Sequence, residues 1–408
     1  MNLVVRQFRD FFVSLKLTVT LLVLSMVLIF AATLDQVNLG IWAVQEKYFR
    51  AFFVLWRVGD IPVPVFPGGY FIGGLLLINL VSAHVYRFTL AWRKAGIFLT
   101  HVGLITLLIG ELLTGLWQEE FSMRLTEGDA KNYSESYRGN ELAFVDKSNA
   151  EFDEVVAIPE ALLARGETVQ HPKLPFRVVT KTYYPNSTLR MRAPAPAGAA
   201  GVAAEPASPA TSGIGPRVSA TPLPLTYNQN ERNLPAAFVE LIGPEGSLGT
   251  WLVSTGLPTP QRIDHGGRTW TIALRFERAY KPFALTLLKF RHDRYAGTEI
   301  PKNFSSRIKL ATPDGRDDRE VLIYMNNPLR YAGLTFYQAS FEPGNDKVTI
   351  LQVVRNPSWL LPYIACTLMT LGLLVQFGIH LKGFVGKRRA PNLSAPSAGS
   401  AFQPPPSG

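Results

Sequence analysis

The sequence predicts a membrane protein with four transmembrane α-helices and a large, mostly antiparallel β domain between the third and the fourth helix. Three observations support this fold class. Apolar residues gather in four long runs, and basic residues flank these runs on one side. The long segment between the last two runs has the residue patterns of strands instead of helices.

The four apolar runs match the thickness of a bilayer. A helix needs about 20 apolar residues to cross roughly 30 Å of hydrocarbon. The runs 17–34, 70–86, 96–117 and 358–381 approach or reach this length. A cleaved signal peptide is an alternative for the first run, but the run is longer than the about 7–15 apolar residues usual in such peptides. We therefore predict that all four helices are retained.

The basic residues predict the orientation of these helices. The formal net charge is +10, which by itself is also compatible with nucleic-acid binding. However, nearly all of this charge lies beside one end of the helices, where only Asp10 opposes ten basic residues, and this is the positive-inside pattern. These residues are Arg6, Arg9, Lys16, Arg87, Arg93, Lys94, Lys382, Lys387, Arg388 and Arg389.

The charge pattern predicts a multi-pass protein in contact with membrane lipid and without a nucleic-acid partner. The membrane region 1–117 has three helices, and its connection 87–94 lies in the cytoplasm with both termini. The domain 118–357 then lies on the outer, periplasmic side. No transit-peptide pattern is present, which favours the bacterial inner membrane over a plastid.

Strand patterns dominate residues 118–357. Apolar and alternating runs bounded by turn residues predict strands, and Gly266-Gly267 predicts a hairpin turn. An antiparallel sandwich and an irregular barrel both fit this pattern. The predicted strands are 142–145, 176–179, 236–242, 269–276 and 347–355, and a short helix is predicted at 160–165.

Two segments have compositions that oppose folding. Residues 193–224 are rich in Ala, Pro, Gly, Ser and Thr, and the tail 382–408 becomes similar from about residue 390. Such segments bury too little apolar surface to offset the entropy lost on ordering. We predict a disordered insertion at 193–224 and a disordered cytoplasmic tail at 382–408.

Motifs of independent catalysis are absent from the sequence. Cys366 is the only cysteine, so the chain has no C-x-x-C redox or haem-attachment motif. It also lacks G-x-S-x-G, Walker and H-E-x-x-H motifs. His171, His265 and His292 lack metal-ligand spacing and are interpreted as surface or loop residues. We predict no catalytic residues in this chain.

Histidines in the predicted helices indicate a cofactor instead. His84, His101 and His380 all lie within roughly 10 Å of the predicted cytoplasmic boundary, by helical rise. Neutral imidazole is a frequent ligand of haem iron. His101 lies deepest and is the candidate ligand of haem iron, with His84 as a second cofactor-binding candidate. Reaching out to the interface is the alternative for all three, and most of all for His380.

Three glycines define one face of the third helix. Gly96, Gly103 and Gly110 are seven residues apart, which suits close helix packing. His101 points roughly away from this face. We therefore expect the glycines to pack within this chain and His101 to face a partner subunit.

Nearly the whole sequence, except the insertion 193–224 and the tail, resembles the ResB family, also called CcsB. The most specific match precedes the last helix and follows N-x-P-L-x-Y-x-G-x-x-F-Y-Q. We interpret 331–341 as one strand that includes Gly333. The matching residues are Asn326, Pro328, Leu329, Tyr331, Gly333, Phe336, Tyr337 and Gln338, then 282–290, Tyr295, Gly297, Pro301, Phe304, Ser306, 14–18 and 101–103.

The resemblance implies a role in system II cytochrome c maturation. Proteins of this family work with a CcsA-like (ResC-like) haem-handling membrane protein, and the complex attaches haem to apocytochrome c outside the membrane. The implied cofactor is a transient haem b, and the functional membrane histidine of the family maps best onto His101, then His84. This chain lacks the Trp-rich motif of CcsA, so we expect a non-catalytic subunit of a haem lyase complex.

Two other functions remain open from the sequence. A structural anchor would bind apocytochrome through the β domain without ligating haem. A b-type haem electron carrier would need axial histidine pairs near both faces of the membrane, whereas the membrane histidines here all lie near one face.

Overall fold

The computed structural model describes residues 3–59, 61–89, 91–149, 151–192, 208–226, 232–298, 301–342 and 344–389. The chain divides into two compact units, which we call the helical unit and the β unit. The helical unit comprises Met1–Ala31, Lys47–Leu116 and Ser358–Gly408, and the β unit comprises Ala32–Glu46 and Trp117–Pro357.

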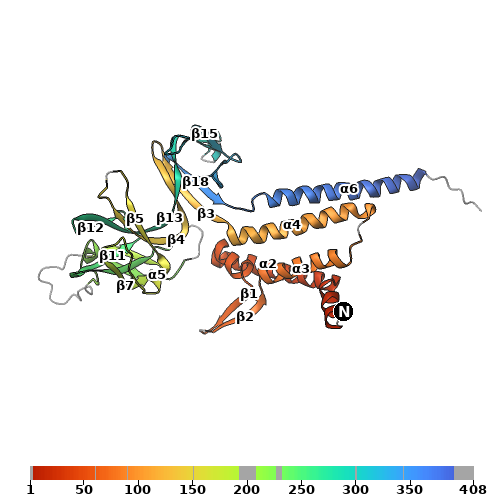
Figure 1. Ribbon diagram of the computed structural model, residues 1–408, viewed down its shortest axis with the longest axis horizontal. Helices are drawn as coiled ribbons and strands as arrows, with labels where there is room; N and C mark the ends of the chain where they lie inside the picture. Colours follow the sequence, from red (N-terminus) through yellow and green to blue (C-terminus); the bar gives the residue numbers. More distant parts are fainter. Residues whose placement is uncertain are drawn as a thin grey trace, which may run out of the picture. The chain divides into compact units, whose positions relative to one another are not determined.

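Four helices of the described chain are long and apolar enough to cross a membrane (Figure 1). They are α2, α3, α4 and α6, and a short helix α1 precedes them. Figure 1 also draws a small β-hairpin, β1–β2, between α2 and α3. The bounds are α1 Leu3–Phe12, α2 Leu15–Val44, a π-helical turn Gln45–Phe49, β1 Phe53–Val58, β2 Ile61–Pro67, α3 Gly69–Tyr86, a 3-10 turn Trp92–Lys94, α4 Ala95–Trp117 and α6 Leu361–Arg389.

Two of the helices, α2 and α6, are longer than the apolar runs that predicted them. Helix α2 does not end near residue 34 but reaches Val44, with a break in helical geometry at Gly40, where φ is 71°. A positive φ suits glycine because it has no Cβ. Helix α6 continues into basic residues as far as Arg389. Residues 382–389 are therefore helical and not disordered, and the rest of the predicted tail lies outside the described residues.

Helix α4 packs against α6 through its three glycines, as the sequence predicted. Gly96, Gly103 and Gly110 are buried. A Cβ added at Gly103 would lie 2.7 Å from Met369 Cγ and 2.8 Å from the carbonyl oxygen of Ala365. Side chains at these positions would push the helices apart, so glycine permits the close approach.

A buried asparagine of α3 forms hydrogen bonds to the junction between α1 and α2. Asn79 of α3 donates through Nδ2 to the carbonyl oxygens of Phe12 (2.7 Å) and Ser14 (3.2 Å), and its Oδ1 accepts from the Thr18 hydroxyl at 2.6 Å. Arg87 donates to the carbonyl of Val13 at 3.1 Å. These bonds satisfy carbonyls freed where α1 ends and α2 begins.

The β unit contains antiparallel sheets. The largest has the order β15-β14-β13-β4-β3-β18-β17-β16, and in addition β5 pairs with β4 and β12 pairs with β13. A four-stranded sheet has the order β11-β10-β7-β6. The bounds are β3 Glu119–Thr126, β4 Ala130–Asp146, β5 Glu154–Pro159, α5 Glu160–Ala164, β6 Thr168–Val169, β7 Arg177–Tyr184, β8 Ser187–Met191, a 3-10 turn Gly215–Arg217, β9 Val218–Pro222, β10 Ala236–Gly243, β11 Gly246–Ser254, β12 Gln261–His265, β13 Arg268–Arg294, β14 Pro301–Ala311, β15 Asp318–Tyr324, β16 Leu329–Tyr331, β17 Leu334–Glu342 and β18 Asn345–Arg355.

Two apolar cores lie along the long strand β13. The first core joins residues such as Trp270 of β13 with Val239 of β10, so two sheets pack face to face as a sandwich. The second core joins Leu287 of β13 with Ile323 of β15 and Phe336 of β17, which all belong to one sheet. That sheet must curve around its own core. Sandwich and barrel-like packing, the two alternatives from the sequence, are both present.

The structure confirms the predicted strands and corrects two local interpretations. Residues 331–341 are not one strand: Ala332 and Gly333 have φ of 50° and 76° and form a hairpin turn between β16 and β17. The predicted disordered insertion is ordered from 208 to 224, where Val218 is buried and β9 pairs with β8. The prediction of disorder used the average composition of the segment, which does not show the spaced apolar residues of 208–224. Residues 193–207 lie outside the described residues.

Candidate functional site

The structure brings the two candidate histidines together. His84 near the end of α3 and His101 near the start of α4 have ring centroids 4.7 Å apart, with an interplanar angle of 49°. Both residues are partly buried. Antiparallel packing of α3 and α4 explains the contact, because the connection 87–94 folds the end of one helix back along the start of the next.

Backbone contacts fix the chemical role of each ring. His84 Nδ1 lies 3.0 Å from the carbonyl oxygen of Leu80, and His101 Nδ1 lies 2.7 Å from that of Ile97. A carbonyl only accepts, so we assign the proton to Nδ1 in both rings. In the neutral imidazole this leaves a lone pair on Nε2, the atom available to a metal.

The Nε2 atom of His84 is buried and makes no hydrogen bond with the described part of the chain. A buried polar atom without a partner is rare and costs free energy unless a ligand, ion or water satisfies it. The pair therefore has an unsatisfied ligand atom within a bundle of membrane-type helices. The Nε2 atom of His84 is therefore available to a metal-containing cofactor.

Two aromatic rings lie beside His84 of the pair. Phe88 stacks on His84 with centroids 5.2 Å apart, and Phe98 lies 6.5 Å from His84 and 5.6 Å from Phe88. These rings give the histidines an apolar surface that suits a flat macrocycle such as a porphyrin. Neither residue was predicted from the sequence, although Phe88 follows His84 by four positions and Phe98 precedes His101 by three.

The spacing of the rings limits how haem iron fits. Two imidazoles on opposite sides of one iron have centroids about 6 Å apart, from a metal–nitrogen bond of about 2 Å and the size of the ring. The observed 4.7 Å is shorter. The residues therefore fit ligation by one histidine, and joint axial ligation would require α3 and α4 to separate.

Part of the His101 ring contacts α3 of this chain. The glycine face of α4 packs on α6 as predicted, but His101 on the other side contacts His84 of α3. His101 stays partly exposed, so the expectation that it faces another subunit stays a prediction. The helical wheel gave the right direction for His101, but it cannot say which helix lies there.

The remaining candidates in the helices lie apart from this pair. His380 of α6 is exposed, and its Nε2 accepts from the Gln376 amide at 2.9 Å. Within the described chain, no ring contact joins it to His84 or His101. Glu111 is exposed on α4. The structure thus separates two of the three membrane histidines from the third.

One histidine of the β unit was interpreted wrongly from the sequence. The His292 side chain is only 2% exposed and packs between the rings of Phe304 (5.0 Å) and Phe341 (4.2 Å). Alternation along β13 explains this, because Phe290 and His292 point to the same inner face of the sheet. His292 is therefore a core residue, and no group of three or more metal-ligating side chains occurs in the described parts of the chain.

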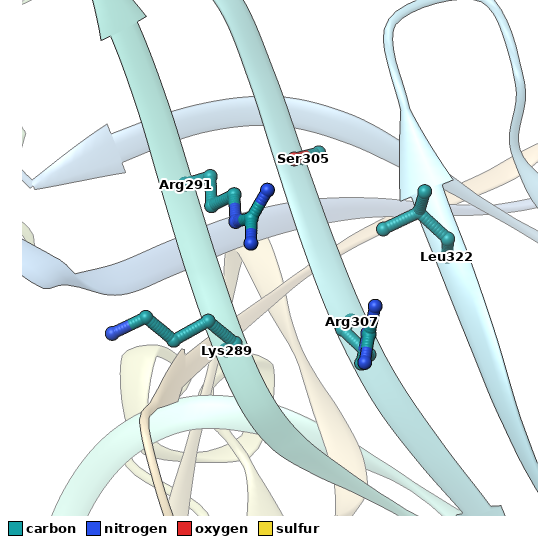
Figure 2. A pocket seen from close by; sticks show the side chains of 5 residues that line it. All are labelled: Lys289, Arg291, Ser305, Arg307 and Leu322. Atoms are coloured by element: carbon teal, nitrogen blue, oxygen red, sulfur yellow. The ribbon is translucent and has the colours of Figure 1, made fainter.

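The β unit also has a shallow basic hollow of about 150 Å³ (Figure 2). Lys289 and Arg291 come from β13, Ser305 and Arg307 from β14, and Leu322 from β15. Figure 2 shows the Lys289 amine pointing away from the other cations. Glu127 pairs with Lys289 at 3.2 Å, and Glu320 lies 4.0 Å from Arg307. These carboxylates offset two of the three charges, so the hollow offers less unsatisfied chemistry than the histidine pair.

Comparison with known proteins finds a family match within the β unit. Residues 263–350, from β12 into β18, match the model of the ResB-like family. The chain is ResB-like over this segment. The resemblance that the N-x-P-L-x-Y-x-G-x-x-F-Y-Q residues indicated is thereby confirmed.

A relative of known name gives a second match. The chain is 34% identical over 111 residues to Protein NrfI of Wolinella succinogenes, which covers 26% of this chain and 12% of NrfI. The chain thus matches only a small part of that relative. The ResB-like match lies in the β unit and does not include His84 or His101.

Proposed function

We propose that this protein is a membrane subunit of a cytochrome c maturation complex. The ResB-like match over 263–350 and the four helices that are apolar and long enough to cross a membrane support this proposal. The β domain lies on the outer side of a bacterial inner membrane, because the basic residues gather at the opposite ends of the helices. There it meets apocytochrome c.

The histidine pair takes part in passing haem through the membrane. A haem bound here supplies an iron that accepts one imidazole nitrogen. His101 offers Nε2 as the ligand, since its Nδ1 is held by the carbonyl of Ile97. His84 supports this position from α3, because its ring contacts the ring of His101. Phe88 and Phe98 add an apolar surface beside the His84 ring.

Covalent attachment belongs to a partner in this proposal. The chain has no C-x-x-C motif and no Trp-rich haem-presenting motif. A CcsA-like membrane protein therefore supplies the catalytic site, and this chain supplies a haem position and a surface for the apocytochrome. The contact between the rings of His84 and His101, with Nδ1 of each ring held by a backbone carbonyl, is the single observation that favours haem ligation over a purely structural anchor.

An absorption spectrum of the detergent-purified protein tests the proposal, with and without its CcsA-like partner. We expect a reduced-haem band in the wild type that falls several-fold in His101→Ala and less in His84→Ala. His380→Ala is the matched control, because His380 lies apart from the pair and should leave the band unchanged. In His101→Gly, added imidazole should restore the band by occupying the space of the deleted ring.

The outcomes separate the two functions. Loss of the band in His101→Ala with imidazole rescue in His101→Gly supports ligation by His101. Normal haem content in both single variants and in the double variant would leave the chain as an anchor. Equal loss in His380→Ala would indicate general damage to the helices instead of loss of a ligand.

A further inference from the structure

Within the described residues, most of the apolar surface of the hairpin β1–β2 in the helical unit is exposed. Phe53, Leu55, Trp56, Val58, Ile61 and Val65 are all exposed. Trp56 pairs with Val63 and Leu55 pairs with Pro64, so exposed apolar residues occur on both faces of the ribbon. A two-stranded hairpin of this kind is marginal in water without a surface to pack on.

The base of the hairpin is fixed to the helices. Val54 is buried in a cluster with Leu21 and Leu28 of α2 and Ile72 of α3. The amide of Gly68 donates to the carbonyl of Phe52 at 2.8 Å, and the Phe53 and Phe71 rings lie 5.4 Å apart. The hairpin therefore starts where α3 starts, between two consecutive helices of membrane-spanning type.

The outer edge of β2 is unsuited to pairing with another strand. Pro62 and Pro64 are alternate residues of β2, opposite Arg57 and Leu55. Alternate residues of an antiparallel strand direct their N–H groups away from the partner strand, and proline has none. The prolines therefore remove hydrogen-bond donors from that edge, which blocks strand addition and lowers the cost of leaving water.

We propose that the hairpin β1–β2 lies in the bilayer interface and contacts lipid with both faces. Three features favour lipid over a protein strand. Exposed apolar residues lie on both faces beside Arg57, the β2 edge has no donors at positions 62 and 64, and the hairpin lies between two helices of membrane-spanning type. Trp56 acts as an interfacial anchor, because indole is enriched at the level of the headgroups. The remaining backbone groups of the edges keep the hairpin near water and headgroups, above the hydrocarbon centre. This inference needs membrane insertion of α2 and α3 but not haem binding.

Site-specific fluorescence quenching of the full chain in proteoliposomes tests the inference. Cys366→Ser provides a background without cysteine, and Leu55→Cys and Trp56→Cys place an environment-sensitive dye on opposite faces of the hairpin. Phe30→Cys on α2 is the reference for lipid contact, and Leu322→Cys in the β unit is the reference for water contact, since both side chains are exposed. Lipids with nitroxide at shallow depth and aqueous iodide are the two quenchers.

We expect both hairpin positions to be quenched by the shallow nitroxide and to be several-fold less sensitive to iodide than Leu322→Cys. Strong iodide quenching without lipid quenching would place the hairpin in water and overturn the inference. Protection from both quenchers would mean a protein partner and would also overturn it. Absence of lipid quenching at Phe30→Cys would show that α2 is not inserted in the membrane, which overturns the premise of the inference. As a second measurement, Trp56→Phe should lower the share of native tryptophan fluorescence quenched by brominated lipid.

Discussion

The helical unit and the β unit bury apolar surface in different ways. In the β unit, two cores contain large side chains that are fully removed from solvent, such as Trp270 and Phe336. In the helical unit, large side chains such as Phe30 and Phe377 stay exposed, and buried glycines mediate the contact between α4 and α6. The β unit is therefore stabilised by a water-excluding core, while the helices depend on close backbone approach, a few hydrogen bonds and lipid.

The largest effect is expected in the curved core of the β unit. Phe336→Ala removes a fully buried ring and should cost about 3–5 kcal/mol of unfolding free energy. Tyr337→Ala is the matched control, because the neighbouring side chain is 37% exposed and its truncation should cost about 1 kcal/mol or less. Thermal unfolding followed by tryptophan fluorescence measures both. Equal losses would contradict the view that the core stabilises this unit.

A pH-dependent effect is expected at a buried lysine of the same unit. Lys281 is 8% exposed, and its amine donates to the Ser134 hydroxyl at 2.6 Å and to the carbonyl of Ala279 at 2.9 Å. Burial lowers the pKa of Lys281 from its ordinary value to about 8. The unfolded chain therefore binds more protons between pH 8 and the ordinary lysine pKa, so raising the pH through this range relieves a destabilising charge.

Comparing the wild type with Lys281→Met measures how much this change of charge contributes to the free energy of unfolding. The stability of the wild type relative to the variant should increase by roughly 1–3 kcal/mol as the pH rises from below 8 to above 10. Subtracting the variant removes the titration of other groups. A constant difference between the two proteins over this range would mean that Lys281 keeps an ordinary pKa.

In the helical unit, a loss of stability is expected when a side chain is enlarged at the contact between α4 and α6. Gly103→Ala places a Cβ 2.7 Å from Met369 Cγ and 2.8 Å from the carbonyl of Ala365, and we expect a loss of about 1–3 kcal/mol. Gly378→Ala in α6 is the control, because a Cβ there meets nothing within 4 Å. The thermal midpoint in detergent measures both variants. If Gly378→Ala is as harmful as Gly103→Ala, the glycine face is not what joins α4 to α6.

The sequence predicted most of this fold because its signals are local. Runs of apolar residues identify helices, and alternation with Gly266-Gly267 identifies the hairpin of β12 and β13. Long-range packing left no such signal. Alternation along 331–341 suggested one strand, although Ala332 has a positive φ that its residue type does not predict.

The candidate site was predictable in its residues but not in its geometry. Membrane depth grouped His84, His101 and His380, and only the packing of α3 on α4 separates the first two from the third. Depth carries no information on which helices are neighbours. Likewise, His292 looked like a surface residue until the register of β13 placed it opposite Phe304 in the sheet.

The smallest effect is expected where hydrogen bonds, and not volume, hold the helical unit together. Asn79→Leu removes the bonds to Phe12, Ser14 and Thr18, and hydrogen bonds between membrane helices contribute about 0.6 kcal/mol on average and up to about 1.7 kcal/mol. Thr18→Val removes only the hydroxyl and should cost less, since Asn79 keeps its two backbone carbonyls. In the double variant the losses should be less than additive, because both changes break the same Thr18–Asn79 bond. Strict additivity in thermal midpoints would mean that the two side chains act independently, and the tie between the start of α2 and α3 would then rest on the backbone bonds of Asn79 alone.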